Sequence, residues 1–279
     1  MSKSFFSTIK DAFSSKSLPG IVEADRAPHY NANSFPLGIS AKGEVVSWEP
    51  FRSPHLLATG PAGSGKTNLI RNLIAHSSTY ADQWAIVGVD FTGQMQELTK
   101  DGEHVVLAVA TNVEDGLEAC AFAVEEMMSR YKRMEEHNVN NVRDLKDGTK
   151  NLLLVIDSAS TFLTPSGSKT DEGKAEDEKK REASVILGDI ARLGRASGVF
   201  VVLSTQRADA NIVYGEFKQN LSTRMVLGKV DSIHSHMTLD NEKATTIEKV
   251  KGRAYLQKFN EEGQEIQTYL ATQEWLENR

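Results

Sequence analysis

Cysteine is almost absent from this chain of 279 residues, which contains only Cys120. No disulfide can form within the chain, so a scaffold held together by disulfides is excluded. Cys120 lies in the apolar run of residues 119–123, where a buried small side chain is expected rather than a reactive thiol. This cysteine content fits a reducing, cytoplasmic compartment.

Long apolar runs are also missing, and no stretch reaches the roughly 18 residues that a membrane-spanning helix requires. Residues 1–16 place Phe5, Phe6, Ile9 and Phe13 at roughly helical spacing but lack the apolar core and cleavage site of a signal peptide. We expect residues 1–36, which are rich in Ser, Asn and Pro, to form an arm or linker that docks on a protein partner.

An excess of basic residues is absent as well, since 32 Lys and Arg face 38 Asp and Glu and the net charge is -6. Proteins that coat nucleic acid are usually basic. Any contact with nucleic acid must therefore come from a local basic patch. The charge counts against a DNA-related function without excluding one.

From about residue 37, apolar strand-like runs alternate with segments of helical periodicity. Strands are expected at residues 43–48, 55–59, 84–90, 105–108, 152–157 and 199–204, and helices at residues 66–76, at 111–138 and before Gly198. This alternation predicts an α/β fold, a mostly parallel sheet with helices on both faces. Residues 37–279 then form one domain, which ends in a hairpin of residues 254–259 and 266–271.

Two local features of this domain are less regular. The spacing of Thr111 and Glu114 is typical of a capping box and predicts the start of the long second helix. Residues 165–182 are highly charged and have no apolar face. We interpret them as an exposed loop insertion or as the solvated start of a helix.

The strongest motif is a glycine-rich loop between a predicted strand and a predicted helix. In such a loop, backbone N–H groups surround phosphates, a lysine adds positive charge, and a hydroxyl on the next residue binds Mg²⁺. The helix that follows directs the positive end of its dipole at the anion. The motif predicts a P-loop that binds a nucleotide through Gly60, Pro61, Ala62, Gly63, Ser64, Gly65, Lys66 and Thr67.

Polar side chains follow two other predicted strands. Asp157 ends the most apolar strand, at the position typical of an acid that supports Mg²⁺ beside a P-loop. Gln206 follows the next strand and is a weaker candidate for contact with the terminal phosphate or the attacking water. Arg192 and Arg195 lie on the helix before that strand, where either a solvated helix face or an arginine that reaches a neighbour's nucleotide would fit.

Several further segments form a recognisable series along the chain. They are residues 55–57 before the P-loop, Val89-Asp90 with residues 96–98, residues 125–132 with 138–141, residues 194–198 with 204–207, residues 220–224, and Gly252-Arg253-Ala254. Together they resemble the motor domain of the FtsK/SpoIIIE family, within the larger FtsK–HerA group of pumping ATPases. The resemblance runs from about residue 37 to about residue 258, and the order and spacing of the segments agree as well as their residues.

The resemblance implies a RecA-like ATPase core that works as a homo-oligomeric ring, usually a hexamer, and that couples ATP hydrolysis to movement of double-stranded DNA or, in secretion-type relatives, of protein. Lys66 and Thr67 would then hold phosphate and Mg²⁺. Asp157 matches the Walker B aspartate and second Mg²⁺ ligand, Gln206 matches the sensor, and Arg195 matches the arginine that acts on a neighbour's nucleotide.

Two departures from the family pattern qualify this prediction. Ser158 stands where the family has a glutamate that positions water, and serine cannot accept a proton at neutral pH as a carboxylate can. Either hydrolysis is slow, or another acid such as Asp90 substitutes, or the chain mainly binds nucleotide. The second departure is the absence of the family's membrane domain and winged helix, from which we expect a phage or mobile-element protein or a subunit of a larger complex.

We therefore expect an ATP-driven motor for double-stranded DNA, acting in DNA transfer, packaging or segregation. One alternative is a secretion-type ATPase that moves protein, which the acidic composition favours. Another is a nucleotide-binding regulatory subunit with weak hydrolysis, which Ser158 favours.

Overall fold

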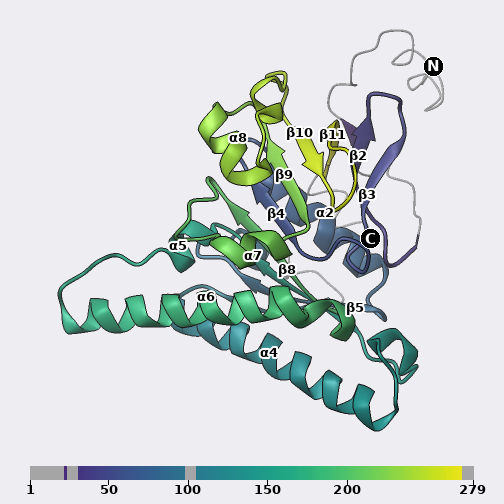
Figure 1. Ribbon diagram of the computed structural model, residues 1–279, viewed down its shortest axis with the longest axis vertical. Helices are drawn as coiled ribbons and strands as arrows, with labels where there is room; N and C mark the ends of the chain where they lie inside the picture. Colours follow the sequence, from purple (N-terminus) through teal and green to yellow (C-terminus); the bar gives the residue numbers. More distant parts are fainter. Residues whose placement is uncertain (1–21, 24–30, 98–104, 272–279) are drawn as a thin grey trace.

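A computed structural model describes residues 22–23, 31–97 and 105–271 of the chain (Figure 1). The predicted amphipathic segment at residues 1–16 lies outside the described residues, as does Leu98 of the family-like segment. The sheet, its covering helices and the predicted phosphate-binding loop all lie within the described ranges.

The first half of the sheet is parallel and carries the predicted site. Its order is β9 (Thr223–Leu227), β4 (Leu56–Thr59), β8 (Val199–Thr205), β7 (Asn151–Ile156), β5 (Trp84–Val89) and β6 (Val106–Ala110). The strands β4, β5, β7 and β8 are buried along their whole length, which explains their continuous apolar sequence. Because all six strands are parallel, their carboxyl ends meet at one edge of the sheet.

The second half of the sheet is antiparallel. Beyond β9 lie β10 (Arg253–Gln257), β11 (Gln264–Leu270), β2 (Phe35–Ser40) and β3 (Val45–Trp48). The β10–β11 pair confirms the predicted hairpin. The predicted boundary at residue 37 falls inside β2, and β1 (Val22–Glu23) pairs with β11. Among the described residues of the predicted arm, Val22, Glu23, Phe35 and Pro36 thus lie in strands of the same sheet, and residues 31–34 form the turn before β2.

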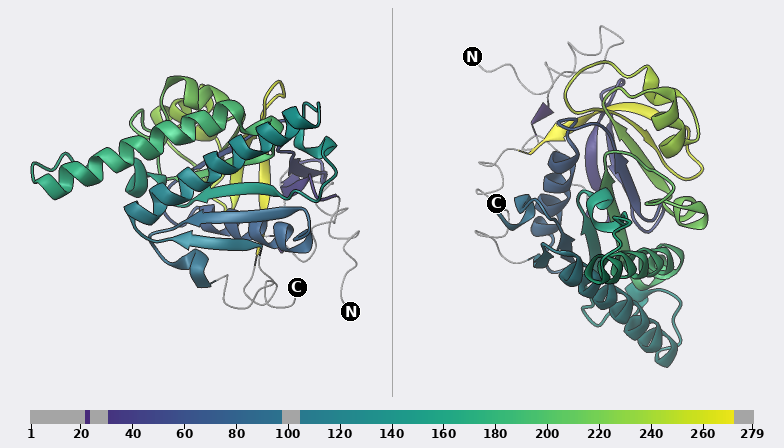
Figure 2. Two further views of the ribbon diagram at one scale, coloured as in Figure 1. Left: turned by 90° about the horizontal axis from the view of Figure 1, so that it is seen from below. Right: turned by 90° about the vertical axis from the view of Figure 1, so that its left-hand side faces the viewer.

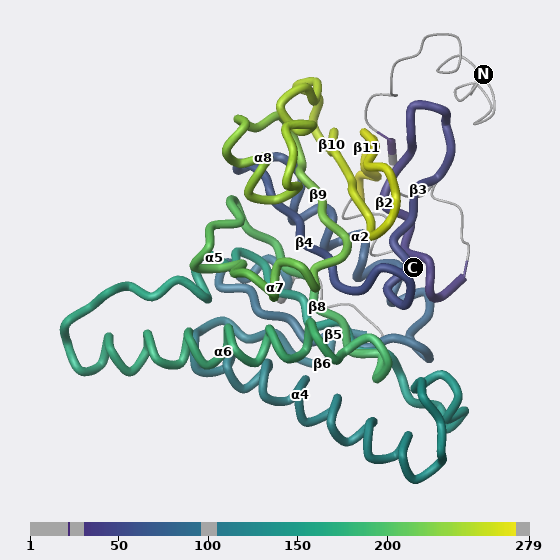
Figure 3. The backbone as a smooth tube through the Cα atoms, viewed as in Figure 1, coloured from purple at the N-terminus to yellow at the C-terminus, as the bar shows by residue number. Residues whose placement is uncertain are grey.

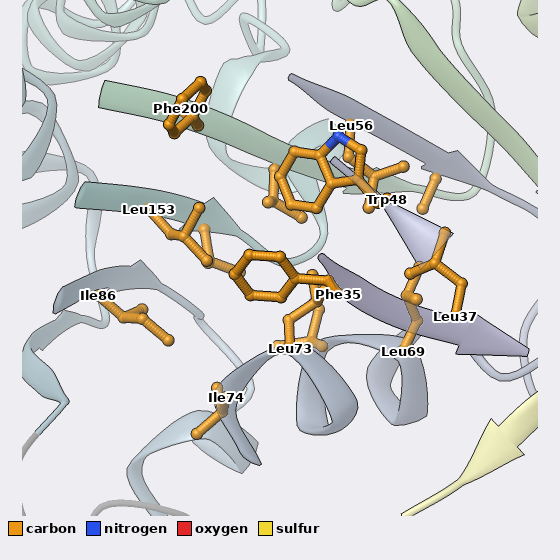
Figure 4. Packing of buried hydrophobic residues seen from close by; sticks show 14 of the residues in the cluster. Phe35, Leu37, Trp48, Leu56, Leu69, Leu73, Ile74, Ile86, Leu153 and Phe200 are labelled. Carbon is orange, nitrogen blue, oxygen red and sulfur yellow. The ribbon is translucent and has the colours of Figure 1, made fainter. Parts of the chain in front are cut away.

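Helices cover both faces of the parallel half, as predicted. On one face, α2 (Lys66–Thr79) packs Leu69 and Leu73 into a core shared with β2, β3 and β4 (Figure 4). On the other face lie α4 (Val113–Glu136), α5 (Ala159–Leu163) and α6 (Asp171–Ser197) (Figure 2). Cys120 of α4 is buried there, and burial raises the pKa of its thiol to about 12, as expected for a packing residue.

The other helices of the described residues are short and lie in the connections between the longer elements. They are α3 (Gln94–Glu97), α7 (Gly215–Asn220), α8 (Ser232–Leu239) and the 3₁₀ turns η2 (Val142–Asp144) and η3 (Lys243–Thr245). Within the described ranges, no helix is both long and apolar enough to cross a membrane.

The start of α4 differs from the predicted capping box. Asn112, rather than Thr111, is the N-cap residue, and its side chain accepts a hydrogen bond from the backbone N–H of Asp115 at 3.0 Å. Asparagine is at least as good an N-cap residue as threonine, and Asn112 directly precedes Val113, the first residue of the helix. The prediction placed the helix correctly and its cap one residue too early.

The predicted loop insertion at residues 165–182 is mostly helix. α6 begins at Asp171, and its first half projects beyond the sheet in both Figure 1 and Figure 2. The connector before it follows those first turns (Figure 3) and is fixed there by Asp177, whose carboxylate accepts the backbone N–H groups of Ser166 and Gly167. The alternative of a solvated helix start is therefore correct from residue 171, and only the connector is a loop.

Candidate nucleotide-binding site

The predicted phosphate-binding loop connects the carboxyl end of β4 to the first turn of α2. Gly60, Gly63 and Gly65 have φ values of 149°, 73° and 113°, in the range that favours glycine. A Cβ on Gly60 would lie 2.2 Å from the carbonyl oxygen of Leu227, so β9 also requires a glycine there. The loop thus has the backbone turn that a phosphate cradle needs, at the positive end of α2.

Lys66 folds back over this loop. Its ammonium group donates to the carbonyl oxygens of Gly60 at 2.7 Å and Pro61 at 3.0 Å. Burial lowers the pKa of Lys66, and the negative charge of Asp157 opposes that shift. The hydroxyl of Ser64 is buried, and no described group forms a hydrogen bond with it. A partly desolvated cation and an unpaired buried hydroxyl fit a polyphosphate ligand.

Asp157 follows β7 and lies beside the start of α2. Its Oδ1 accepts hydrogen bonds from Ser204 Oγ and from the backbone N–H of Ser158, both at 2.9 Å. Its Oδ2 lies 3.4 Å from the hydroxyl of Thr67. Burial raises the pKa of Asp157, and the hydrogen bond from Ser204 opposes the increase. The two oxygen ligands predicted for Mg²⁺ are therefore adjacent.

Asp90 is poorly placed to replace the missing glutamate. It is fully buried after β5, and its carboxylate accepts three hydrogen bonds: from the backbone N–H and hydroxyl of Thr92 at 2.7 and 2.6 Å, and from the N–H of Met95 at 2.7 Å. These bonds hold the turn between β5 and α3. A carboxylate with both oxygens occupied in this way is a structural acceptor, which argues against the hypothesis that Asp90 acts as the base.

Ser158 occupies the glutamate position with a left-handed backbone, φ 60° and ψ 51°, and is the N-cap residue of α5. Its N–H points to Asp157, as the hydrogen bond above requires. The backbone therefore turns sharply directly after Asp157. Nothing in this geometry gives the serine hydroxyl the basicity of a carboxylate.

Gln206 directly follows β8 and lies next to the loop. Its carbonyl oxygen accepts a hydrogen bond from the N–H of Gly60 at 3.3 Å, and its side chain is exposed. The structure thus brings Gln206, Asp157 and the P-loop together at the carboxyl edge of the sheet, where ligands of open α/β sheets bind.

Arg195 lies at the opposite edge. It is in the last turn of α6, near the amino end of β8, and its Nε donates to the carbonyl oxygen of Phe51 at 2.7 Å. It lines an open pocket of about 400 Å³ together with Arg52 and Arg143. Arg192 is exposed and pairs with Asp189, as a residue on a solvated helix face would. Arg195 therefore lies at the edge of the sheet opposite its own P-loop.

Two residues of the carboxyl edge were not predicted from the sequence. Ser204 faces Asp157 from β8. Its position near the end of this strand, two residues before Gln206, is the feature of the sequence that could have indicated it. His234 lies on α8, and the charges of Lys66 and Arg207 reach it. No motif marks it, because the proximity of α8 to the loop arises only from the fold.

Comparison with known proteins agrees with this geometry. The model of the FtsK/SpoIIIE family matches residues 23–170. The chain is 26% identical over 242 residues to a DNA translocase FtsK of Clostridium acetobutylicum, covering 82% of this chain and 30% of that protein. It is 28% identical over 221 residues to the DNA translocase FtsK of Corynebacterium glutamicum, covering 73% and 23%. The chain thus spans less than a third of these relatives.

Solved structures show the same fold. The pCW3 conjugation coupling protein TcpA, determined with ATPγS, superposes with a TM-score of 0.82 at 25% identity, covering 93% of this chain and 72% of that one. The cytoplasmic domain of the Thermomonospora curvata type VII secretion ATPase EccC gives a TM-score of 0.70 at 22% identity, covering 90% and 31%. With a RecA-like core, a P-loop and a family model that matches more than half of its length, the chain belongs to the FtsK/SpoIIIE family of P-loop ATPases.

Proposed function

We propose that this chain is an ATP-driven motor that moves double-stranded DNA and works as a homo-oligomeric ring. The observation that carries the proposal is the meeting of the P-loop, Asp157 and Gln206 at one edge of the sheet in a member of this family. Curated relatives are named DNA translocases, and TcpA is named a conjugation coupling protein. DNA is therefore the proposed substrate.

The roles of the residues follow from their placement. Lys66 would exchange its two carbonyl partners for phosphate oxygens when ATP binds. Thr67 and Asp157 would hold Mg²⁺, which would offset the charge that develops on the phosphates. Ser204 would fix the orientation of Asp157, and the exposed side chain of Gln206 would contact the terminal phosphate or its attacking water.

Arg195 would act across a subunit boundary. The last turn of α6 places it at the amino edge of the sheet, and neither terminal nitrogen of its guanidinium has a hydrogen-bond partner among the described residues. In a head-to-tail ring, this edge of one subunit can face the nucleotide of the next. The proposed site is then complete only in the oligomer.

A second candidate is a nucleotide-binding subunit with weak turnover. Ser158 in place of the glutamate, together with the three donors bound to Asp90, favours it. General base catalysis contributes about 10²–10⁴-fold to the rates of enzymes that use it. A chain without that contribution would hydrolyse ATP slowly while binding it normally.

The decisive experiment measures steady-state ATP hydrolysis at low salt, with and without linear double-stranded DNA, beside a Lys66→Ala control. Low salt is needed because a motor that binds DNA independently of sequence contacts the DNA phosphates, and this binding weakens steeply as the salt concentration rises. Displacement of a triplex-forming strand from the same DNA reports movement. Hydrolysis that rises with DNA, displaces the strand and disappears in Lys66→Ala would support the motor.

Other outcomes separate the alternatives. ATP hydrolysis at the same rate with and without DNA would contradict the DNA motor and favour a protein-moving ATPase. Tight ATP binding without hydrolysis in either condition would contradict an autonomous motor and favour the regulatory subunit. Failure of the wild-type chain to bind ATP would contradict all three.

A further inference from the structure

The helix α8 contacts the end of β4, directly before the phosphate-binding loop. The hydroxyl of Thr238, in its last turn, forms a hydrogen bond of 2.9 Å with the hydroxyl of Thr59, the residue directly before Gly60. Thr238 and Thr59 are both fully buried. His234 stands one helical turn before Thr238 and therefore on the same face of α8, directed at the carboxyl edge of the sheet.

His234 is buried and lacks a partner. The residue is 7% exposed, and no described group forms a hydrogen bond with its buried Nε2. An unpaired polar atom in a protein interior is costly, and it calls for a physical reason. The helix itself does not need this imidazole, because α8 is capped by Asp231, whose carboxylate accepts from the backbone N–H of His234 at 2.7 Å.

Four charged groups act on the His234 ring. Arg207 comes from the segment after β8 and Lys66 from the P-loop, whereas Asp231 and Asp209 are acids on the flanking loops. Arg207 also contacts α8 directly, since its Nη2 lies 3.4 Å from the sulfur of Met237. Burial lowers the pKa of His234 most, the two cations lower it further, and the two acids partly compensate.

Binding of a polyphosphate would add negative charge close to these groups. If the charge of Lys66 reaches His234, the opposite and larger charge of phosphates held against Lys66 must reach it as well. We propose that the buried, unpaired His234 ring takes up a proton from solvent when the P-loop binds a nucleoside triphosphate. The inference rests on the proposed nucleotide binding at this loop.

The proton adds to the ring nitrogen that carries none in the neutral form and makes His234 an imidazolium. The site then gains up to one positive charge for each nucleotide bound and loses it on release. The pKa of His234 lies below its ordinary value in the free protein and rises in the complex. Nucleotide affinity therefore increases as the pH falls through the window between these two pKa values, by at most about tenfold per pH unit for one proton.

The test counts protons during ATPγS binding. Calorimetric titrations at about pH 6.5, in two buffers of different ionisation enthalpy, give the number taken up per nucleotide. His234→Gln removes the titrating ring and keeps a polar side chain of similar reach. The matched control is His236→Gln on the same helix, because the His236 ring is exposed and lies 3.6 Å from Glu242.

We expect wild-type protein and His236→Gln to take up a fraction of a proton, up to about one, more than His234→Gln. Protonation changes of ATPγS itself are common to all three proteins and cancel in the difference. Equal proton uptake in wild type and His234→Gln, with both proteins binding ATPγS, would overturn the inference and leave the proposed function intact. A wild-type chain that does not bind ATPγS would instead contradict the proposed function.

A measurement on the wild-type protein covers the case in which His234→Gln does not fold. The chain has seven histidines, and their ring signals can be followed by NMR in histidine-labelled protein as the pH is varied. One of these signals should titrate at a higher pH once ATPγS is saturating. If no histidine signal shifts upward in this way, the inference is wrong.

Discussion

Ser204 Oγ lies 2.9 Å from Asp157 Oδ1, so the acid at the end of β7 is held in place by the neighbouring strand β8. This hydrogen bond favours the charged form of Asp157, whose pKa burial has already raised. Since Mg²⁺ binds the carboxylate and not the acid, Ser204 should tune metal affinity and its pH dependence.

Ser204→Ala should lower the affinity for Mg²⁺, measured through ATP binding or hydrolysis, by about 10–100-fold. It should also raise the pKa of Asp157 further, so that Mg²⁺ affinity is lost at a higher pH than in wild type as the solution is acidified. Mg²⁺ titrations at several pH values check both effects. Ser197→Ala is the control, because Ser197 is equally buried but donates to the carbonyl oxygen of Gly194 near the other edge.

Ser158→Glu tests whether the missing carboxylate limits turnover. Glutamate restores the group that the family uses to position water, and we expect kcat to rise by about 10²-fold or more with little change in ATPγS affinity. The backbone at residue 158 is already left-handed for a non-glycine residue, so the substitution adds little strain. Ser158→Gln has the same shape without the basicity and should not raise kcat. An equal gain in both variants would contradict a role as base.

Most of the parallel half of the fold and the predicted site could be read from the sequence, because both depend on local patterns. The buried strands are continuous apolar runs. The loop from Gly60 to Thr67 has the spacing of glycine, lysine and threonine that is specific to phosphate-binding loops. Asp157 and Gln206 follow such strands, and parallel strands bring their carboxyl ends to one edge. Their meeting beside the loop was therefore predictable without knowledge of side-chain contacts.

The parts that were missed depend on contacts between distant segments. β2 lies partly within the predicted arm, because residues 35–36 show no alternation, and the burial of Phe35 against Trp48 and Trp84 comes only from packing. Residues 171–182 lack an apolar face because the helix projects past the sheet and needs none. His234 lies near Lys66 through the Thr59–Thr238 contact, which joins residues 179 positions apart.

Some family-like residues prove to be structural. Arg130, in the segment of residues 125–132, is buried and donates to the carbonyl oxygens of Ser197 and Gly198 at 2.9 and 3.2 Å. The hydroxyl of Tyr131 donates to the carbonyl oxygen of Leu193 at 2.6 Å. Both fasten α4 to the end of α6. This motif therefore positions the turn that carries Arg195, and a sequence pattern alone could not have separated that function from catalysis.

Gly60→Ala should damage the loop more than Gly63→Ala. A Cβ at residue 60 would lie 2.2 Å from the carbonyl oxygen of Leu227, whereas a Cβ at residue 63 meets no described atom within 4 Å. We expect Gly60→Ala to lower the free energy of unfolding by at least about 2 kcal/mol and Gly63→Ala by about 1 kcal/mol, the usual cost of a left-handed alanine. Urea denaturation of both variants checks this order. Equal stability of the two would mean that β9 can move away from the loop.

Mixing two inactive variants tests whether Arg195 acts on a neighbour. Lys66→Ala should not bind nucleotide, and Arg195→Ala should bind ATPγS normally but hydrolyse ATP poorly, because its own P-loop lies at the opposite edge of the sheet from residue 195. In mixed oligomers, the intact arginine of a Lys66→Ala subunit can serve the intact loop of an Arg195→Ala subunit. Random pairing makes about one quarter of the interfaces complete, so an equal mixture should recover up to that share of wild-type hydrolysis. Arg192→Ala, which removes the exposed partner of Asp189, is the control and should stay active alone. If the mixture stays as inactive as its components while the subunits still assemble, Arg195 does not act across the boundary, and its contact with Phe51 is then its whole function.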